Sequence, residues 1–191
     1  MKTENKVLMQ KAYEALSGKW GLAVGTFFIY ILILGGIQVV PIVGSIAALI
    51  IAGPMALGLV IFTLSISRNK EAKLGQIFEG FDNFGTSLGA YLLMLVFIIL
   101  WMLLLIVPGI IAAISYSQTF FIIADDNTIG ADEAIDKSKA MMDGYKVKYF
   151  LLCLRFIGWI LLCILTLGIG FLWLMPYMYV TFANFYDDIK D

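Results

Sequence analysis

The sequence predicts an all-α membrane protein with six transmembrane helices, arranged as three helical hairpins. Of its 191 residues, 61% are hydrophobic and 14% are charged, whereas soluble domains average about 45–50% apolar and about 25% charged residues. The charges are also segregated, because residues 20–67 and 83–124 contain none and residues 149–186 contain only Arg155. Roughly 20 apolar residues cross a bilayer as a helix, so each of these three blocks is long enough for two spans.

Each block divides at a central turn. Glycine or proline residues gather at residues 35–44, 107–109 and 166–170, and such residues interrupt helices. Re-entrant hairpins, whose turns stay inside the membrane, are an alternative, but their backbone groups would have to be satisfied within the protein. We therefore predict full spans at about residues 20–39, 43–66, 87–107, 109–124, 149–165 and 169–186.

The basic residues predict the orientation of these spans. Twelve of the thirteen Lys and Arg residues, Lys2 among them, lie before, between or after the three blocks, and the thirteenth, Arg155, lies just inside the third block. With two spans in each block, all of these segments face the same side of the membrane. Lys and Arg are concentrated on the cytoplasmic side of membrane proteins, so both termini are predicted to be cytoplasmic.

A short amphipathic helix is predicted before each block. Apolar residues recur at the i, i+3, i+4 spacing that is typical of interfacial helices, and Gly18, Asn83 and Gly144 follow the three stripes. The stripes are Leu8, Met9, Ala12, Tyr13 and Leu16; Leu74, Ile77, Phe78 and Phe81; and Ala131, Ala134, Ile135, Ser138, Met141 and Met142. We expect these helices to lie at the cytoplasmic surface of the membrane.

The second arms of the hairpins indicate an internal repeat. Pro54, Ser115 and Pro176 are separated by 61 and 61 residues, and helical hairpins that enter from one side would be related by an axis along the membrane normal. Three unrelated hairpins are the alternative. We predict a single membrane domain, residues 1–191, with repeats at about residues 3–66, 70–126 and 130–188.

Helix-breaking and polar residues in these second arms form a candidate ligand or solute seam. Proline removes a helical hydrogen bond, and interrupted helices at repeat-related positions line the binding sites of many transporters. Alternatively, the prolines are simply tolerated in membrane helices and the polar side chains hydrogen-bond between helices. The candidate residues are Pro54, Ser115, Gln118, Pro176, Tyr177 and Thr181.

Two basic residues near the start of the third block are candidate contacts for lipid headgroups. Arg155 lies seven residues after Lys148, about 10 Å deeper along a helix. Its long side chain can extend back to the headgroups, and a charge inside a span often marks a functional site. A lipid phosphate is the expected partner, and extension to the membrane surface without a specific ligand is the alternative.

Two aspartate pairs end the fourth and sixth predicted spans. Asp125–Asp126 and Asp187–Asp188 place negative charge at helix C-termini, where it opposes the helix dipole. We expect compensation by Lys137, Lys148 or Arg155; a bound cation is the weaker alternative.

Several kinds of chemistry are excluded. Without histidine, the chain has no Ser-His-Asp triad and no histidine-ligated metal. Cys153 and Cys163 lie ten residues apart on one predicted helix, too far apart for a disulfide bond. A net charge of −1 argues against a nucleic-acid partner. We therefore expect no metal and no cofactor.

Six segments together resemble a bacterial integral-membrane family catalogued as domain of unknown function 975. This resemblance covers nearly the whole chain and implies a helical, multi-span protein of the bacterial cell membrane, with no established activity and no site residues to transfer. A more distant similarity to the non-catalytic membrane region of some glycerophosphodiester phosphodiesterases favours an accessory module. The segments are residues 18–24 (GKWGLAV), 53–58 (GPMALG), 77–84 (IFEGFDNF), 105–111 (LIVPGII), 134–144 (AIDKSKAMMDG) and 184–188 (NFYDD).

These observations favour a non-enzymatic membrane module that binds lipid or a partner membrane protein, as a single chain or a homo-oligomer. A small transporter or channel that uses the seam is the main alternative. An enzyme acting on lipid would need clustered acid–base groups, and only the aspartate pairs qualify.

Overall fold

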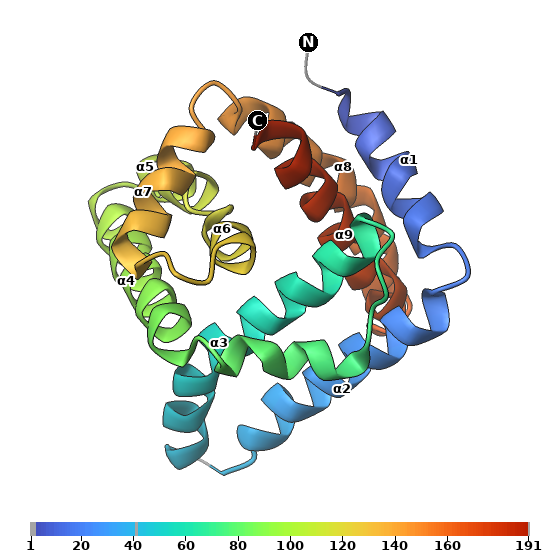
Figure 1. Cartoon of the computed structure of the whole chain (residues 1–191), viewed down its shortest axis with the longest axis horizontal. Coiled ribbons are helices and arrows are strands. Elements are labelled where there is room, and N and C mark those ends of the chain that lie inside the picture. Colours follow the sequence, from blue (N-terminus) through green and yellow to red (C-terminus); the bar gives the residue numbers. More distant parts are fainter. Residues whose placement is uncertain (1–2, 41, 191) are drawn as a thin grey trace.

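A computed structural model of the chain describes residues 3–40 and 42–190, so that Lys2 lies outside the described residues. Every regular element in this part of the chain is a helix (Figure 1). The all-α class predicted from the sequence is therefore confirmed.

The first hairpin consists of α2 (Trp20–Ile37) and α3 (Val43–Ser67), and α1 (Asn5–Leu16) precedes it. The chain turns after α1 at Gly18, where φ is 76°, a left-handed conformation that glycine adopts without steric cost. Pro54 lies inside α3, as the sequence predicts.

The second hairpin differs from the first in two elements. The short helix before it, η1 (Leu74–Phe81), is a 3₁₀ helix, and it is followed by α4 (Phe84–Leu104). The second arm is divided into α5 (Ile106–Ser115) and α6 (Thr119–Asp125). The fourth predicted span is therefore interrupted, although it contains no proline at the break.

The third hairpin repeats the order of the first. Helix α7 (Ala131–Met141) is followed by a turn at Gly144, with φ again 76°, and then by α8 (Lys146–Leu165) and α9 (Phe171–Ile189).

Within the described residues, five helical segments are long and apolar enough to cross a membrane: α2, α3, α4, α5–α6 together (Ile106–Asp125), and α8. These five segments indicate a membrane protein. The sixth expected segment, α9, has 19 residues but is not one of the five. This helix is long enough to cross a membrane. Its C-terminal half, however, carries Asn184, Asp187 and Asp188, which lower its mean hydropathy.

The three short helices pack around the molecule in a cyclic order. Each lies against the second arm of another hairpin: η1 on α3, α7 on α6, and α1 on α9 (Figure 1). Each apolar stripe is buried there in part, because Leu8, Ile77 and Ala134 are each at most 1% exposed, whereas Tyr13 and Phe78 are 61% and 46% exposed. The stripes of the short helices therefore contact the protein on one side and leave other apolar side chains at the surface.

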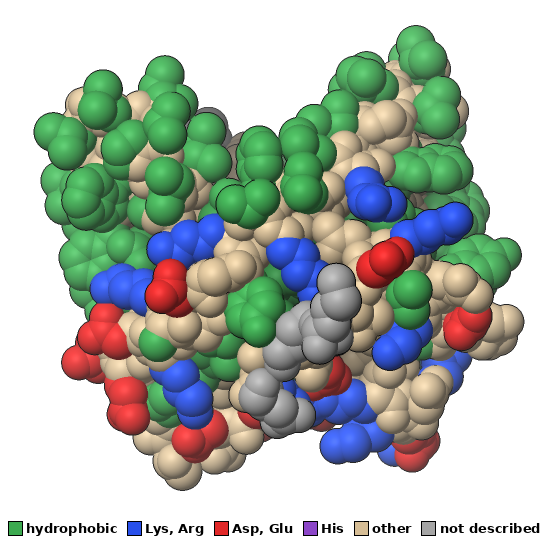
Figure 2. Space-filling view, turned by 90° about the horizontal axis from the view of Figure 1, so that it is seen from above, with side chains coloured by type: hydrophobic (Ala, Val, Ile, Leu, Met, Phe, Trp, Pro, Cys, Tyr) green, Lys and Arg blue, Asp and Glu red, His purple; other side chains and the backbone are tan. Residues whose placement is uncertain are grey.

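Charged and apolar side chains occupy opposite halves of the molecule (Figure 2). We call the half that carries α1, η1 and α7 the charged face. The three hairpin turns lie opposite and form what we call the apolar tips, at residues 39–40 and 42–43, 103–107, and 165–169. Ile42, Leu103 and Leu167 are 76%, 79% and 94% exposed.

Candidate functional site

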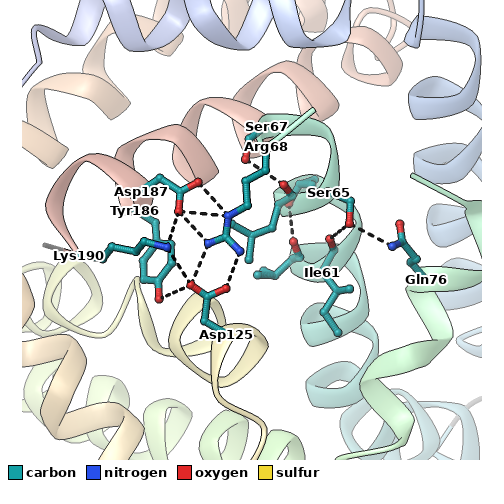
Figure 3. Close-up of polar contacts among 12 residues, drawn as sticks. Ile61, Ser65, Ser67, Arg68, Gln76, Asp125, Tyr186, Asp187 and Lys190 are labelled. Atoms are coloured by element: carbon teal, nitrogen blue, oxygen red, sulfur yellow. Dashed lines mark hydrogen bonds and ion pairs between the residues drawn. The ribbon is translucent and has the colours of Figure 1, made fainter. Parts of the chain in front are cut away.

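The second arms converge at the charged face on a cluster that we call the junction, composed of Arg68, Asp125, Tyr186, Asp187 and Lys190 (Figure 3). Arg68 directly follows α3 and Asp125 ends α6. Tyr186 and Asp187 belong to the end of α9, and Lys190 directly follows it. Below the junction, Leu57 and Val60 of α3 pack with Phe121 of α6 and Ala183 of α9. The apolar contacts and the charged cluster hold the same three helices together.

Arg68 bridges the two carboxylates in the junction. Its Nη1 and Nη2 donate to Asp125 at 2.6 and 2.8 Å, and its Nη2 and Nε donate to Asp187 at 2.7 and 3.1 Å. Lys190 Nζ lies 3.3 Å from Asp125 and 3.2 Å from Asp187, and the Tyr186 hydroxyl donates to Asp125 at 3.1 Å. Both carboxylates are thus engaged by Arg68 in the two-bond geometry that gives the strongest charge-assisted pairs.

The electrostatics of the junction are balanced within the protein. Two cations face two carboxylates, and each carboxylate sits at a helix C-terminal end, where it needs compensation. Hydrogen bonds to Asp125 and Asp187 raise the pKa of Arg68 further above its ordinary value, so the guanidinium remains charged at any working pH. A cluster in which every charge has a partner is suited to fastening helices and leaves no charge for a ligand.

The sequence anticipated this compensation only in part. Lys148 pairs with Asp188 at 2.7 Å, as one of the three expected options. Asp125 and Asp187 are instead paired by Arg68, which sequence reasoning missed. The one signal in the sequence was its position directly after the uncharged residues 20–67. Its partners lie 57 and 119 residues away.

The residues of the predicted seam lie in separate environments. Pro54 packs beneath η1, where a Cβ on Gly80 would overlap the Pro54 carbonyl oxygen. Thr181 is fully buried and donates its hydroxyl hydrogen to Tyr177 O at 2.7 Å within α9. Tyr177 faces a groove described below, and Pro176 precedes it within α9. Pro54, Ser115 and Pro176 line neither the groove nor the basic hollow that are described below.

Ser115 and Gln118 flank the break between α5 and α6, where a side chain of α7 satisfies the backbone. The Ser138 hydroxyl donates to Ser115 O at 2.7 Å and accepts from the Gln118 N–H at 3.2 Å. Gln118 is fully buried, and its Oε1 has no hydrogen-bond partner among the described residues. The polar run of the fourth span is therefore used to accommodate a helix break.

An apolar groove of about 470 Å³ lies between the first and third hairpins. Its walls come from α1, the start of α2, α8 and α9, and most of the side chains that line it are apolar or aromatic. They are Tyr13, Trp20, Trp159, Leu162, Cys163, Thr166, Gly170, Trp173, Leu174 and Tyr177. Trp159 and Trp173 are 54% and 51% exposed, so the groove opens to the surroundings.

A second hollow of about 500 Å³ adjoins the groove, since Tyr13 and Tyr177 line both. Its other lining residues are Lys6, Met9, Gln10 and Arg155. We call it the basic hollow. It contains one of the two predicted headgroup contacts, Arg155. The other, Lys148, is turned toward Asp188 instead.

Comparisons with the curated proteins and with the solved structures find no match. The model of a protein family, described as proteins of unknown function (DUF975), matches residues 1–115 and residues 102–191. The chain belongs to the DUF975 family. The family description assigns no activity, so any function has to be argued from the site. Within residues 3–40 and 42–190, no group of three His, Cys, Asp or Glu side chains is arranged to hold a metal ion.

Proposed function

We propose that this DUF975 protein is a non-enzymatic membrane module that binds lipid in the groove between its first and third hairpins. The observation that carries the proposal is the groove itself: about 470 Å³, lined mainly by apolar and aromatic side chains and open at its tryptophans. Ligand pockets are typically concave, largely apolar and of about 300–1,000 Å³. A groove of this kind on a membrane protein is filled by hydrocarbon when it faces the bilayer.

The proposal includes a topology. Six membrane-inserted segments form three repeats, with both termini on the cytoplasmic side of a bacterial cell membrane. The cyclic packing of α1, η1 and α7 on the second arms supports three related units. The left-handed Gly18 and Gly144, both at φ 76°, support a common design for the first and third. The basic residues support the cytoplasmic orientation.

The test compares two neighbouring substitutions on α8. Leu162 lines the groove, whereas Leu161 does not, although the two are 54% and 58% exposed. Leu162→Trp fills the groove and is expected to reduce the lipid retained after gentle detergent extraction, measured by native mass spectrometry. Leu161→Trp should retain as much lipid as the parent chain. Equal retention in both variants would contradict the proposal, and a stoichiometric second protein in place of lipid would favour a partner-binding module.

A transporter remains the second candidate because of the break between α5 and α6. Interrupted helices occur at transporter binding sites, and the buried Gln118 Oε1 has no partner within the described part of the chain. If a solute passes this point, Gln118→Ala and Pro176→Ala should abolish its flux into proteoliposomes. A lipid-binding module would keep its groove occupancy in both variants.

A further inference from the structure

We propose that the groove and the basic hollow form one site for an anionic phospholipid, whose phosphate lies between Lys6 and Arg155 and whose acyl chain fills the groove. This inference rests on the proposed function and names the lipid class. The occupant follows from the pairing of an apolar channel with a positively charged end, which matches the two chemical parts of such a lipid.

The two hollows have the continuity and the length that one lipid requires. Tyr13 and Tyr177 line both. Along α8, the lining extends from Arg155 to Thr166, a separation of eleven residues, or about 16 Å of helix. The hydrocarbon core of a bilayer is about 30 Å thick, so that one leaflet contributes about 15 Å. The combined length of the groove and the basic hollow therefore matches the thickness of one leaflet.

The charges at this site have no acidic partner in the part of the chain that the structure describes. Lys6 and Arg155 are both exposed, and neither forms an ion pair within residues 3–40 and 42–190. All six residues that line the basic hollow are neutral or basic. A guanidinium binds phosphate with two parallel hydrogen bonds, and a lysine ammonium adds a point charge.

The wall that carries Lys6 is fixed in place. The Thr3 N–H donates to Asp188 at 3.1 Å, Asn5 Nδ2 donates to Lys148 O at 2.9 Å, and Asn184 Nδ2 donates to Leu8 O at 3.4 Å. These bonds join α1 to α8 and α9 on both sides of Lys6. Because the walls are tied together, the site is organised before the lipid arrives, which lowers the cost of binding.

The two basic residues depart from the pattern of the proposed repeats. Counting from Gly18, Asn83 and Gly144, the position of Arg155 corresponds to Ile29 and Met94, which are apolar. The position of Lys6 corresponds to Glu71 and Asp132, which are acidic. A bundle of this kind therefore forms without a positive charge at either position, and the charges at this one place point to a ligand.

The test is a titration of the purified full-length protein with phosphatidylglycerol or phosphatidylcholine of identical acyl chains, followed by native mass spectrometry. The parent chain should prefer phosphatidylglycerol. Lys6→Gln and Arg155→Gln should each reduce that preference about fivefold, and the double variant should abolish it. The control is Lys11, an exposed lysine on α1, the helix that also carries Lys6; Lys11 lines neither hollow. Lys11→Gln should leave the preference for phosphatidylglycerol unchanged. Melting temperatures confirm that the variants are folded.

The possible failures are distinguishable. Equal binding of both lipids by the parent chain, or an unchanged preference in the double variant, overturns the anionic site and leaves lipid binding in the groove intact. If the parent chain binds neither lipid more strongly than the Leu162→Trp variant does, the proposed function is overturned as well. A dimer that excludes lipid and dissociates in Leu162→Trp would assign the groove to a second copy of the chain.

Discussion

The chain has two arginines, and the structure places them in opposite surroundings. Arg68 lies in the junction, where two aspartates bind it and Lys190 completes a neutral cluster. Arg155 borders the basic hollow, and none of the described residues that line that hollow is acidic. Arg68 directly follows the uncharged residues 20–67, whereas Arg155 lies within the apolar block of residues 149–186. The difference is in their partners: a paired charge fastens helices, and an unpaired charge beside an apolar groove is free to bind a ligand.

This contrast also separates the two functions of α9. At its C-terminal end, Asp187 and Lys190 join α3 and α6. Nearer its start, Trp173 and Tyr177 line the groove. We therefore expect substitutions at the junction to change stability and substitutions at the groove to change binding.

The largest loss of stability is expected at the close contact between η1 and α3, which involves no charged side chain. A Cβ on Gly80 would overlap the Pro54 carbonyl, so Gly80→Ala should push η1 away from α3 and weaken the junction, with a loss of about 3 kcal/mol in the free energy of unfolding. Gly75→Ala, on the same short helix and with open space where the added methyl group would lie, should be nearly neutral. Unfolding in detergent micelles measures both. Equal losses would mean that the close contact does not determine how α3 is held.

A smaller loss is expected when Arg68 is replaced. Arg68→Gln leaves Asp125 and Asp187 facing each other with only Lys190 between them, and should cost about 2 kcal/mol, less than for a fully buried pair because these side chains are 23–27% exposed. Replacing both aspartates by asparagine in the same protein should recover part of the loss, since the unpaired charges are then gone. If chemical unfolding showed that the loss for Arg68→Gln and the loss for the two aspartate substitutions simply add, the stabilities contributed by these residues would not depend on one another, and the account of the junction would be contradicted.

The smallest of these effects concerns Ser138, whose hydroxyl bonds both sides of the break between α5 and α6. Ser138→Ala should cost about 1 kcal/mol, because it leaves a buried carbonyl and a buried N–H without that partner. Ser17→Ala, at an exposed position, is the control. If Ser138→Ala changed lipid binding in the groove more than stability, the separation of fastening and binding regions would be wrong.

Local features of the fold could be predicted from the sequence. Uncharged blocks and glycine turns fix where helices begin and end, and α2 begins at Trp20 and α3 at Val43 as expected. The stripe on residues 74–81 fits α and 3₁₀ helices alike, so the 3₁₀ form of η1 depends on its close approach to α3. The break before α6 was not predicted either, because its support comes from Ser138 on another helix.

The candidate site was predictable to a lesser degree. The charge of Arg155 within an apolar block indicated a lipid contact from the sequence alone, and the same residue lines the basic hollow. Lys6 and the groove tryptophans gave no such signal, because they come together only when α1 and α2 pack beside α8 and α9. The pairing of Arg68 depends in the same way on residues far apart in the chain.

The most direct test of the two-arginine contrast is the thermal stability of three proteins, each measured with and without phosphatidylglycerol: the parent chain, Arg68→Gln and Arg155→Gln. A lipid at 100 times its dissociation constant stabilises a protein by about 2.7 kcal/mol. We expect Arg68→Gln to melt at a lower temperature and to keep the lipid-induced increase, whereas Arg155→Gln should melt like the parent without lipid and lose most of the increase. The opposite pattern, or the same response in both variants, would contradict the assignment of Arg68 to the fold and Arg155 to the ligand.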